Sequence, residues 1–177
     1  MKKIYSNNKK GLLFWITGLS GSGKSTLGDS IFKYVIKKYG PTIVLSGDDL
    51  REIFSYKKFD KKSRFKYALS YSKFCKKIVD QNVNLIFSTV SLFHKVRKWN
   101  RKNITNYLEI YIESDIDKLT SKKKKFFYKK KHKNIVGKNI KAEFPKNPDI
   151  IIENKFNKSI SKINNELLFK IKKIMKK

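Results

Sequence analysis

The sequence has little cysteine, few arginines and no long apolar run, and each shortage excludes a class of protein. A single cysteine, Cys75, excludes an internal disulfide and favours a reducing, cytoplasmic environment. No apolar run approaches the about 20 residues that cross a bilayer, so we expect no membrane span. With 177 residues, 40% of them hydrophobic and 14% aromatic, we expect one folded domain over residues 1–177.

Arginine is scarce although the chain is strongly basic. The formal net charge is +29, yet 39 of the 43 basic residues are lysine, and the chain also holds 21 Ile and 14 Asn but only 2 Ala. This joint bias follows from AT-rich codons, so the charge requires no nucleic-acid partner. Specific recognition of base edges and phosphates favours arginine. We therefore expect no specific nucleic-acid ligand, and we expect guanidinium chemistry to matter at Arg51, Arg64, Arg97 and Arg101.

The segment LLFWITGLSGSGKST, residues 12–26, carries the clearest motif. It contains the phosphate-binding spacing G-x-x-x-x-G-K-[ST] between an apolar strand and a helix. Glycines let the backbone turn so that N–H groups face phosphate oxygens, and Lys24 extends toward the β- and γ-phosphates. The Ser25 hydroxyl is placed to bind Mg²⁺. The predicted nucleoside-triphosphate site comprises Gly18, Leu19, Ser20, Gly21, Ser22, Gly23, Lys24, Ser25 and Thr26.

Strand-like and helix-like segments alternate along the chain. Apolar strands are expected at 12–17, 42–46, 83–88, 107–112 and 149–153, and helices at 24–39, 61–81, 93–103, from about 115, and at about 159–176. Strands separated by helices predict a three-layer α/β/α fold around a five-stranded parallel sheet, the fold of P-loop nucleoside-triphosphate-binding proteins.

Two of the expected helices have apolar stripes. In 61–81 the inner face is expected to carry Phe65, Leu69, Phe74 and Ile78, with Ala68 and Cys75 as further candidates. The last helix carries Ile160, Ile163, Leu167, Ile171 and Ile174, a stripe that predicts core packing, with a membrane-surface helix as the alternative.

Residues 121–141 interrupt this alternation with a basic segment that has no hydrophobic period. A solvated loop is one interpretation. We favour a lid that closes over polyphosphate and excludes water, because the segment lies between the fourth and fifth strands.

A second candidate site, Ser46-Gly47-Asp48-Asp49-Leu50-Arg51, follows the second strand. In a parallel sheet, the carboxyl ends of neighbouring strands face the same crevice. Asp48 could then orient or deprotonate an acceptor hydroxyl opposite the γ-phosphate, and Arg51 could bind an anionic group. The alternative is that Asp48 and Asp49 merely cap the next helix.

Five ordered motifs now carry a resemblance. GLSGSGKSTL, SGDDLREIF, FSTVSLFHKVRKWNR, KFFYKK and AEFPKNPDIII together resemble the adenylylsulfate kinase family over residues 11–153. That family uses ATP to phosphorylate the ribose 3′-hydroxyl of adenosine 5′-phosphosulfate. The resemblance implies catalytic roles for Lys24, Asp48 and Lys125, the last of these in a K-G-L-Y-like motif that ends at Tyr128. It implies acceptor contacts by Asp48, Arg51, Phe59, Arg64, Tyr67, Ser91 and Ile135.

Departures from the family pattern concern the acceptor. Tyr67 replaces an acceptor-binding asparagine, and Ile135 replaces the phenylalanine that stacks on the acceptor adenine. The central stretch is more similar to a branch linked to surface-polysaccharide genes, which includes kinases that act on cytidine diphosphoramidate. The resemblance therefore implies phosphorylation of that nucleotide for capsular polysaccharide modification. The alternative is adenylylsulfate kinase activity in sulfate assimilation.

Two other classes stay open on the sequence. One is a kinase for a sugar or another non-nucleotide acceptor, and the other is an ATPase stimulated by nucleic acid. The expected partner is a small-molecule nucleotide, with ATP and Mg²⁺ as cofactors. The sequence leaves the oligomeric state open, a homodimer included.

Overall fold

Residues 10–121 and 134–176 are described in the structure, a computed structural model. The strands are β1 (Leu13–Gly18), β2 (Thr42–Ser46), β3 (Asn84–Thr89), β4 (Tyr107–Glu113) and β5 (Ile150–Glu153). The helices are α1 (Lys24–Tyr39), α2 (Gly47–Ile53), α3 (Lys61–Val79), α4 (His94–Asn103), α5 (Ile116–Ser121) and α7 (Ile160–Met175). All five strands pair in parallel in the order β2-β3-β1-β4-β5, which confirms the predicted fold class.

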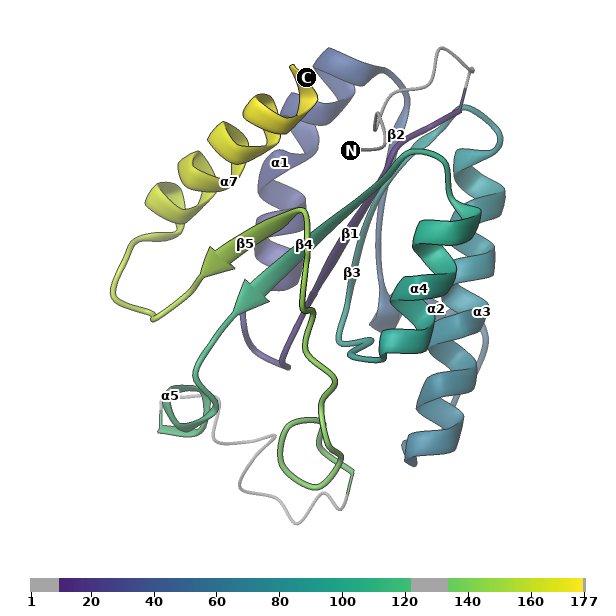
Figure 1. The fold of residues 1–177 in the computed structure, drawn as a ribbon, viewed down its shortest axis with the longest axis vertical. Coiled ribbons are helices and arrows are strands. Elements are labelled where there is room, and N and C mark those ends of the chain that lie inside the picture. The colour runs from purple at the N-terminus through teal and green to yellow at the C-terminus, as the bar shows by residue number, and fades with distance from the viewer. Residues whose placement is uncertain (1–9, 122–133, 177) are drawn as a thin grey trace.

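The sheet is covered by helices on both faces (Figure 1). Successive side chains of a strand point to opposite faces, and β1 is buried along its whole length. Phe14 and Ile16 therefore enter the core with α1 and α7, whereas Leu13 and Trp15 enter the core with α3 and α4. This two-sided burial explains why β1 is an uninterrupted apolar run.

Local sequence signals set the helix ends. The Asp60 side chain accepts a hydrogen bond from the Ser63 backbone N–H at the start of α3, and Ser159 does the same for Lys162 at the start of α7. Gly40 ends α1 with φ 89°, a conformation that disfavours other residues. The predicted boundaries consequently agree with the observed ones to within a residue or two.

The inner face of α3 differs from the prediction. Its fully buried residues are Ala68, Tyr71, Ser72, Cys75 and Val79. The burial of Ala68 and Cys75 confirms the further candidates. Phe65, Phe74 and Ile78 only pack at the margin of the core, and Leu69 is only partly buried. The prediction for these four larger residues was wrong, because the small side chains of Ala68, Ser72 and Cys75 and the Tyr71 ring occupy the face against the sheet.

Two arginines anchor the loop that precedes β5. Arg97 Nε lies 3.2 Å from the buried Glu109 carboxylate, and an Nη atom donates to the Glu143 carbonyl at 2.5 Å. Arg101 bonds Glu109 at 2.9 Å and Asp149 at 3.1 Å. These guanidinium groups are therefore structural. No helix among the described residues combines the length and apolarity needed to cross a membrane.

The apolar stripe of α7 packs into the core, as the sequence predicts. Ile163, Leu167 and Ile171 are buried with α1 and the sheet, whereas Ile160 is 60% exposed. We expect Leu167→Ala to lower the free energy of unfolding by about 3 kcal/mol, because it leaves a cavity in this core. Urea denaturation followed by circular dichroism measures the change.

Phe169→Ala is the matched control, because the Phe169 side chain is 67% exposed on the opposite face of the same helix. Its expected effect is below about 0.5 kcal/mol. Equal losses in the two variants would contradict the packing described for α7.

Candidate active site

The loop between β1 and α1 forms a phosphate-sized cradle. Gly23 has φ 93° directly before α1, in the left-handed region that glycine adopts without strain. A Cβ on Gly18 would lie 2.5 Å from the Ile112 carbonyl oxygen, so only glycine lets the loop pass so close to β4. The sequence motif is thus used as a turn at the amino end of a helix, where backbone N–H groups favour anions.

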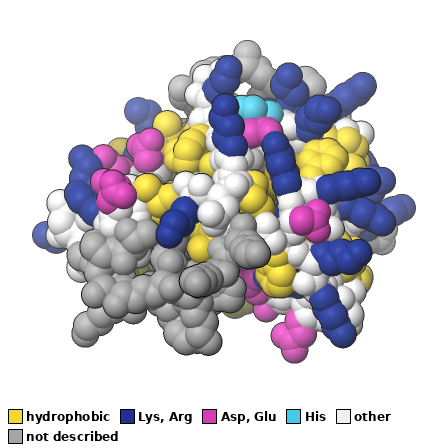
Figure 2. Space-filling model, turned by 90° about the horizontal axis from the view of Figure 1, so that it is seen from below, with side chains coloured by type: hydrophobic (Ala, Val, Ile, Leu, Met, Phe, Trp, Pro, Cys, Tyr) yellow, Lys and Arg dark blue, Asp and Glu magenta, His cyan; other side chains and the backbone are white. Residues whose placement is uncertain are grey.

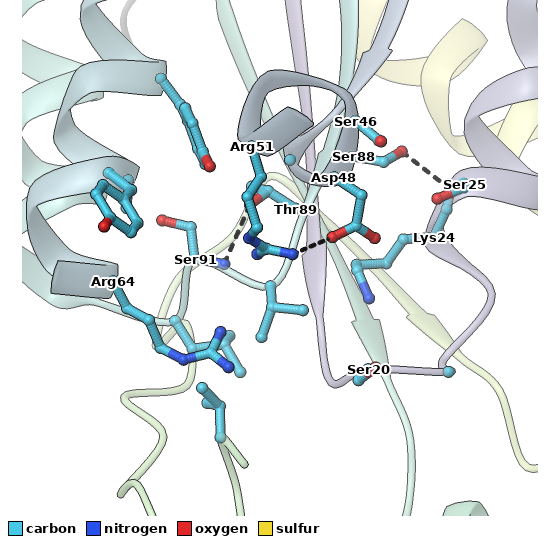
Figure 3. Close-up of a pocket in the computed structure, with 18 of the residues that line it drawn as sticks. Ser20, Lys24, Ser25, Ser46, Asp48, Arg51, Arg64, Ser88, Thr89 and Ser91 are labelled. Atoms are coloured by element: carbon cyan, nitrogen blue, oxygen red, sulfur yellow. Dashed lines mark hydrogen bonds and ion pairs between the residues drawn. The ribbon is translucent and has the colours of Figure 1, made fainter. Parts of the chain in front are cut away.

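Lys24 and Ser25 are the first residues of α1. Lys24 is only 8% exposed, and its Nζ donates to the Leu19 carbonyl at 2.6 Å, so the amine lies across the loop. Ser25 is exposed and lines the adjacent cavity. Ser88 on β3 donates to the Lys24 carbonyl at 3.2 Å and ties the helix start to the sheet (Figure 3).

The two aspartates at the start of α2, Asp48 and Asp49, have different partners. Ser46 and Asp49 form a capping box, in which the Asp49 carboxylate accepts from the Ser46 N–H at 2.7 Å and Ser46 Oγ accepts from the Asp49 N–H at 3.2 Å. Asp48 takes no part in that cap. Its side chain is 86% exposed and pairs with Arg51 at 2.5 Å, an ion pair that a ligand can replace at little cost.

One cavity of about 190 Å³ joins these two sites. Asp48 and Lys24 both line it, and their side chains lie next to each other (Figure 3). The cavity opens at the edge where the strands end, and this face carries many lysine and arginine side chains and few acidic ones (Figure 2). From the nucleotide loop it takes Ser20, Gly21, Gly23, Lys24, Ser25 and Thr26. The two sites predicted from the sequence, the Gly-rich loop and the Asp48 segment, thus face one space.

Arg51 and Arg64 form a cationic pair beside Asp48. Both guanidinium groups lie over the Phe59 ring, at 5.0 and 5.3 Å from its centroid. Burial lowers the pKa of Arg64, and the positive charge of Arg51 lowers it further. Two cations held side by side repel each other, so an anionic ligand between them would relieve that repulsion. This end of the cavity suits a phosphate or sulfate group.

Aromatic residues form the next wall. Tyr67 lines the cavity and stacks on Tyr56, with ring centroids 3.9 Å apart and planes 8° from parallel. Phe59 is 44% exposed and does not line the cavity. It is connected to the site through its contacts with Arg51 and Arg64.

The described end of the predicted lid, residues 134–141, approaches the same cavity. Arg64 donates to the Asn134 carbonyl at 2.9 Å, and Val136 lines the cavity. Ile135 instead packs with a small apolar cluster that includes Leu19 and Leu92. Its proposed acceptor contact therefore stays a prediction. Lys125, Tyr128 and most of the lid (122–133) lie outside the described residues.

Several lining residues were missed by sequence reasoning, namely Lys58, Tyr71, Ser88, Thr89 and Val136. The sequence could have indicated two of them, because Ser88 and Thr89 are the polar residues at the carboxyl end of β3. Nothing in the sequence indicated Tyr71 as a site residue, since a tyrosine within a helix more often belongs to the core. Ser91, predicted from the family pattern, does line the cavity.

Comparison with known proteins identifies a family for this chain. The family model described as adenylylsulphate kinase matches residues 10–153, most of the chain. The protein belongs to the adenylylsulphate kinase family. A cytidine diphosphoramidate kinase of Campylobacter jejuni is 38% identical over 146 residues, which are 80% of this chain and 85% of that one. An adenylyl-sulfate kinase of Clostridium kluyveri is 31% identical over 157 residues, which are 85% and 78% of the two chains.

Solved structures of this family share the fold. The Mycobacterium tuberculosis APS kinase CysC, solved in complex with AMPPNP and APS, superposes with a TM-score of 0.78 at 23% identity, covering 92% of this chain and 98% of that one. A protein described as APE1195 gives a TM-score of 0.79 at 26% identity, covering 94% and 98%. The three-layer architecture is therefore shared with these structures.

Lys24 is the loop residue whose replacement we expect to affect nucleotide binding most. We expect Lys24→Ala to abolish ATP-dependent turnover, because no other side chain supplies a positive charge inside the described part of the loop. ADP release measures turnover, and thermal unfolding checks that the fold survives. Lys37→Ala, an exposed lysine in the last turn of the same helix, should retain activity. Unchanged turnover in Lys24→Ala would contradict the assignment of the donor site.

Proposed function

We propose that this protein transfers the γ-phosphoryl group of ATP to the ribose 3′-hydroxyl of a nucleoside 5′-anhydride, with cytidine diphosphoramidate as the acceptor. The observation that carries the reaction type is the single cavity shared by Lys24 and Asp48. The choice of acceptor is supported by the Campylobacter relative, which is more similar than the adenylyl-sulfate kinases found. The product would serve capsular polysaccharide modification.

The residues divide the work between donor and acceptor. Lys24 and the loop amides would stabilise the charge that develops on the transferred phosphoryl group. The Asp48 carboxylate would accept the proton of the acceptor hydroxyl, or hold that hydroxyl in line. Arg51 and Arg64 would bind the anhydride, which fixes the ribose relative to the cradle. Lys125 retains its proposed role toward the phosphates.

The donor site also fits a magnesium ion. The exposed Ser25 hydroxyl is a hard oxygen ligand on this cavity, and Mg²⁺ is commonly held by one or two protein oxygens together with substrate phosphates. When bound, the ion would neutralise charge on the β- and γ-phosphates. We further propose action in the cytoplasm, where the buried Cys75 thiol stays reduced, and assembly as a homodimer.

Adenylylsulfate is the second candidate acceptor, because the family model and several relatives between 26% and 32% identical carry that activity in their names. A parallel assay with adenosine 5′-phosphosulfate and cytidine diphosphoramidate separates the two. We expect cytidine diphosphoramidate to give at least about tenfold higher kcat/KM, a difference of about 1.4 kcal/mol in transition-state binding. NMR of the product locates the new phosphate. Preference for the sulfate nucleotide would reverse the proposal.

Asp48 is the proposed acceptor-side catalyst. We expect Asp48→Asn to lower kcat by about a hundredfold or more, because an amide cannot take the proton of the acceptor hydroxyl. Asp49→Asn is the matched control, since an amide oxygen can still accept from the Ser46 N–H in the helix cap. A mild effect of Asp48→Asn, similar to that of Asp49→Asn, would show that Asp48 has no catalytic role and only belongs to the start of α2.

A further inference from the structure

Two buried hydroxyl groups on the acceptor side of the cavity have no hydrogen-bond partner within the described chain. They belong to Tyr71, which is 4% exposed, and Ser91, which is 7% exposed. Both residues line the cavity. A buried hydroxyl left without a partner is unfavourable and is rare in folded proteins. Hydroxyls that face a ligand cavity in this state are available to the ligand.

The Tyr71 ring is held firmly by its neighbours. Its centroid lies 5.9 Å from that of Phe87 on β3 and 6.1 Å from that of Tyr56. On a third side, a Cβ built on Gly47 would be 3.7 Å from Tyr71 Cε2. Packing from the sheet, from α2 and from the adjacent loop fixes where the hydroxyl points, so its position is set before any ligand binds.

The Tyr71 hydroxyl belongs to the same electrostatic environment as the cationic pair. Burial raises its pKa to about 12, and the charge of Arg51 acts in the opposite direction. An ionised Tyr71 would in turn raise the pKa of Arg64. At neutral pH the group is therefore a neutral phenol beside two guanidinium groups. A phenol can both donate a hydrogen bond and accept one.

This combination separates two kinds of anhydride. Arginine and lysine side chains only donate, so Arg51, Arg64 and Lys58 bind the oxygens of a sulfate, a phosphate or a phosphoramidate alike. A phosphoramidate end also carries P–N–H donors, which a cation cannot satisfy. Hydroxyl oxygens can accept from them. A site with cations alone would leave the amide hydrogens unpaired, and a site with added hydroxyls would not.

We propose that the hydroxyls of Tyr71 and Ser91 accept hydrogen bonds from the terminal amide of the acceptor and so select a nucleoside diphosphoramidate over its all-oxygen counterparts. This inference rests on the proposed function, since it concerns the same acceptor. Figure 3 shows the Ser91 side chain on the same side of the cavity as Arg51 and Arg64, where the anhydride end would lie.

The test compares cytidine diphosphoramidate with cytidine diphosphate, which has oxygen in place of NH₂ at the terminal phosphorus and one more negative charge, so each variant is compared with the wild-type enzyme on the same nucleotide. The diphosphate is measured as an acceptor or, where it is not phosphorylated, as a competitive inhibitor. We expect Tyr71→Phe to lower kcat/KM for the phosphoramidate about tenfold, the effect of losing one well-formed hydrogen bond, while the constant for the diphosphate changes less than about twofold. Ser91→Ala should act in the same direction. The KM for ATP should stay unchanged in both variants.

Tyr107→Phe is the matched control. Tyr107 is as buried as Tyr71, at 5% exposed, but it lies at the start of β4, away from the cavity. It should alter neither acceptor constant. A purely structural role of Tyr71 would lower both constants together, and this outcome overturns the inference, as does an unchanged ratio of the two. Wild-type enzyme that fails to phosphorylate cytidine diphosphoramidate overturns the proposed function itself, and the assignment of the hydroxyls falls with it.

Discussion

The central position of β1 is the constraint on which the site depends. β1 is hydrogen-bonded to β3 on one side and to β4 on the other, so the loop that follows it leaves the sheet at its middle. There Gly18 passes against the Ile112 carbonyl of β4 with no space for a side chain. Since every strand is parallel, the residues that follow β2 and β3 emerge at the same edge. The cradle, the Asp48 helix and Ser91 meet because of strand order and strand direction.

The four arginines illustrate how one side chain serves two purposes in a lysine-rich protein. Arg97 and Arg101 each contact more than one group around Glu109 and Asp149, a pattern that a planar fork with several donors can satisfy and an ammonium cannot. The arginines thereby compensate the buried Glu109 charge, whose pKa is nevertheless raised by burial. Arg51 and Arg64 instead face the cavity over Phe59. All four arginines of this lysine-rich chain thus stand where guanidinium geometry is used.

Sequence reasoning reached the fold more completely than the site. Strands such as Leu13–Gly18 are predictable because apolar runs and glycine signals are local. The spacing of residues could not show that Asp49 caps α2 and that Asp48 faces the cavity, because this depends on which carboxylate turns back to the Ser46 N–H. The stacking of Tyr67 on Tyr56 was equally hidden, since it joins α3 to the loop after α2. Such contacts arise from helix docking, and no spacing rule along the chain encodes them.

Under the proposed function, we expect selectivity for the acceptor to come from the neutral groups of the cavity. The cationic pair suits any anionic group, and negative charge is common to every nucleoside anhydride that ends in phosphate, sulfate or phosphoramidate. The aromatic wall and the buried hydroxyls, by contrast, respond to shape and to the direction of each hydrogen bond. Tyr56, Tyr67 and Tyr71 are packed together, so a change in one ring displaces the others. Under the proposed function, changes at Tyr56, Tyr67 or Tyr71 would alter the choice of acceptor and leave the phosphate-binding loop intact, because these rings lie beside the cationic pair of Arg51 and Arg64.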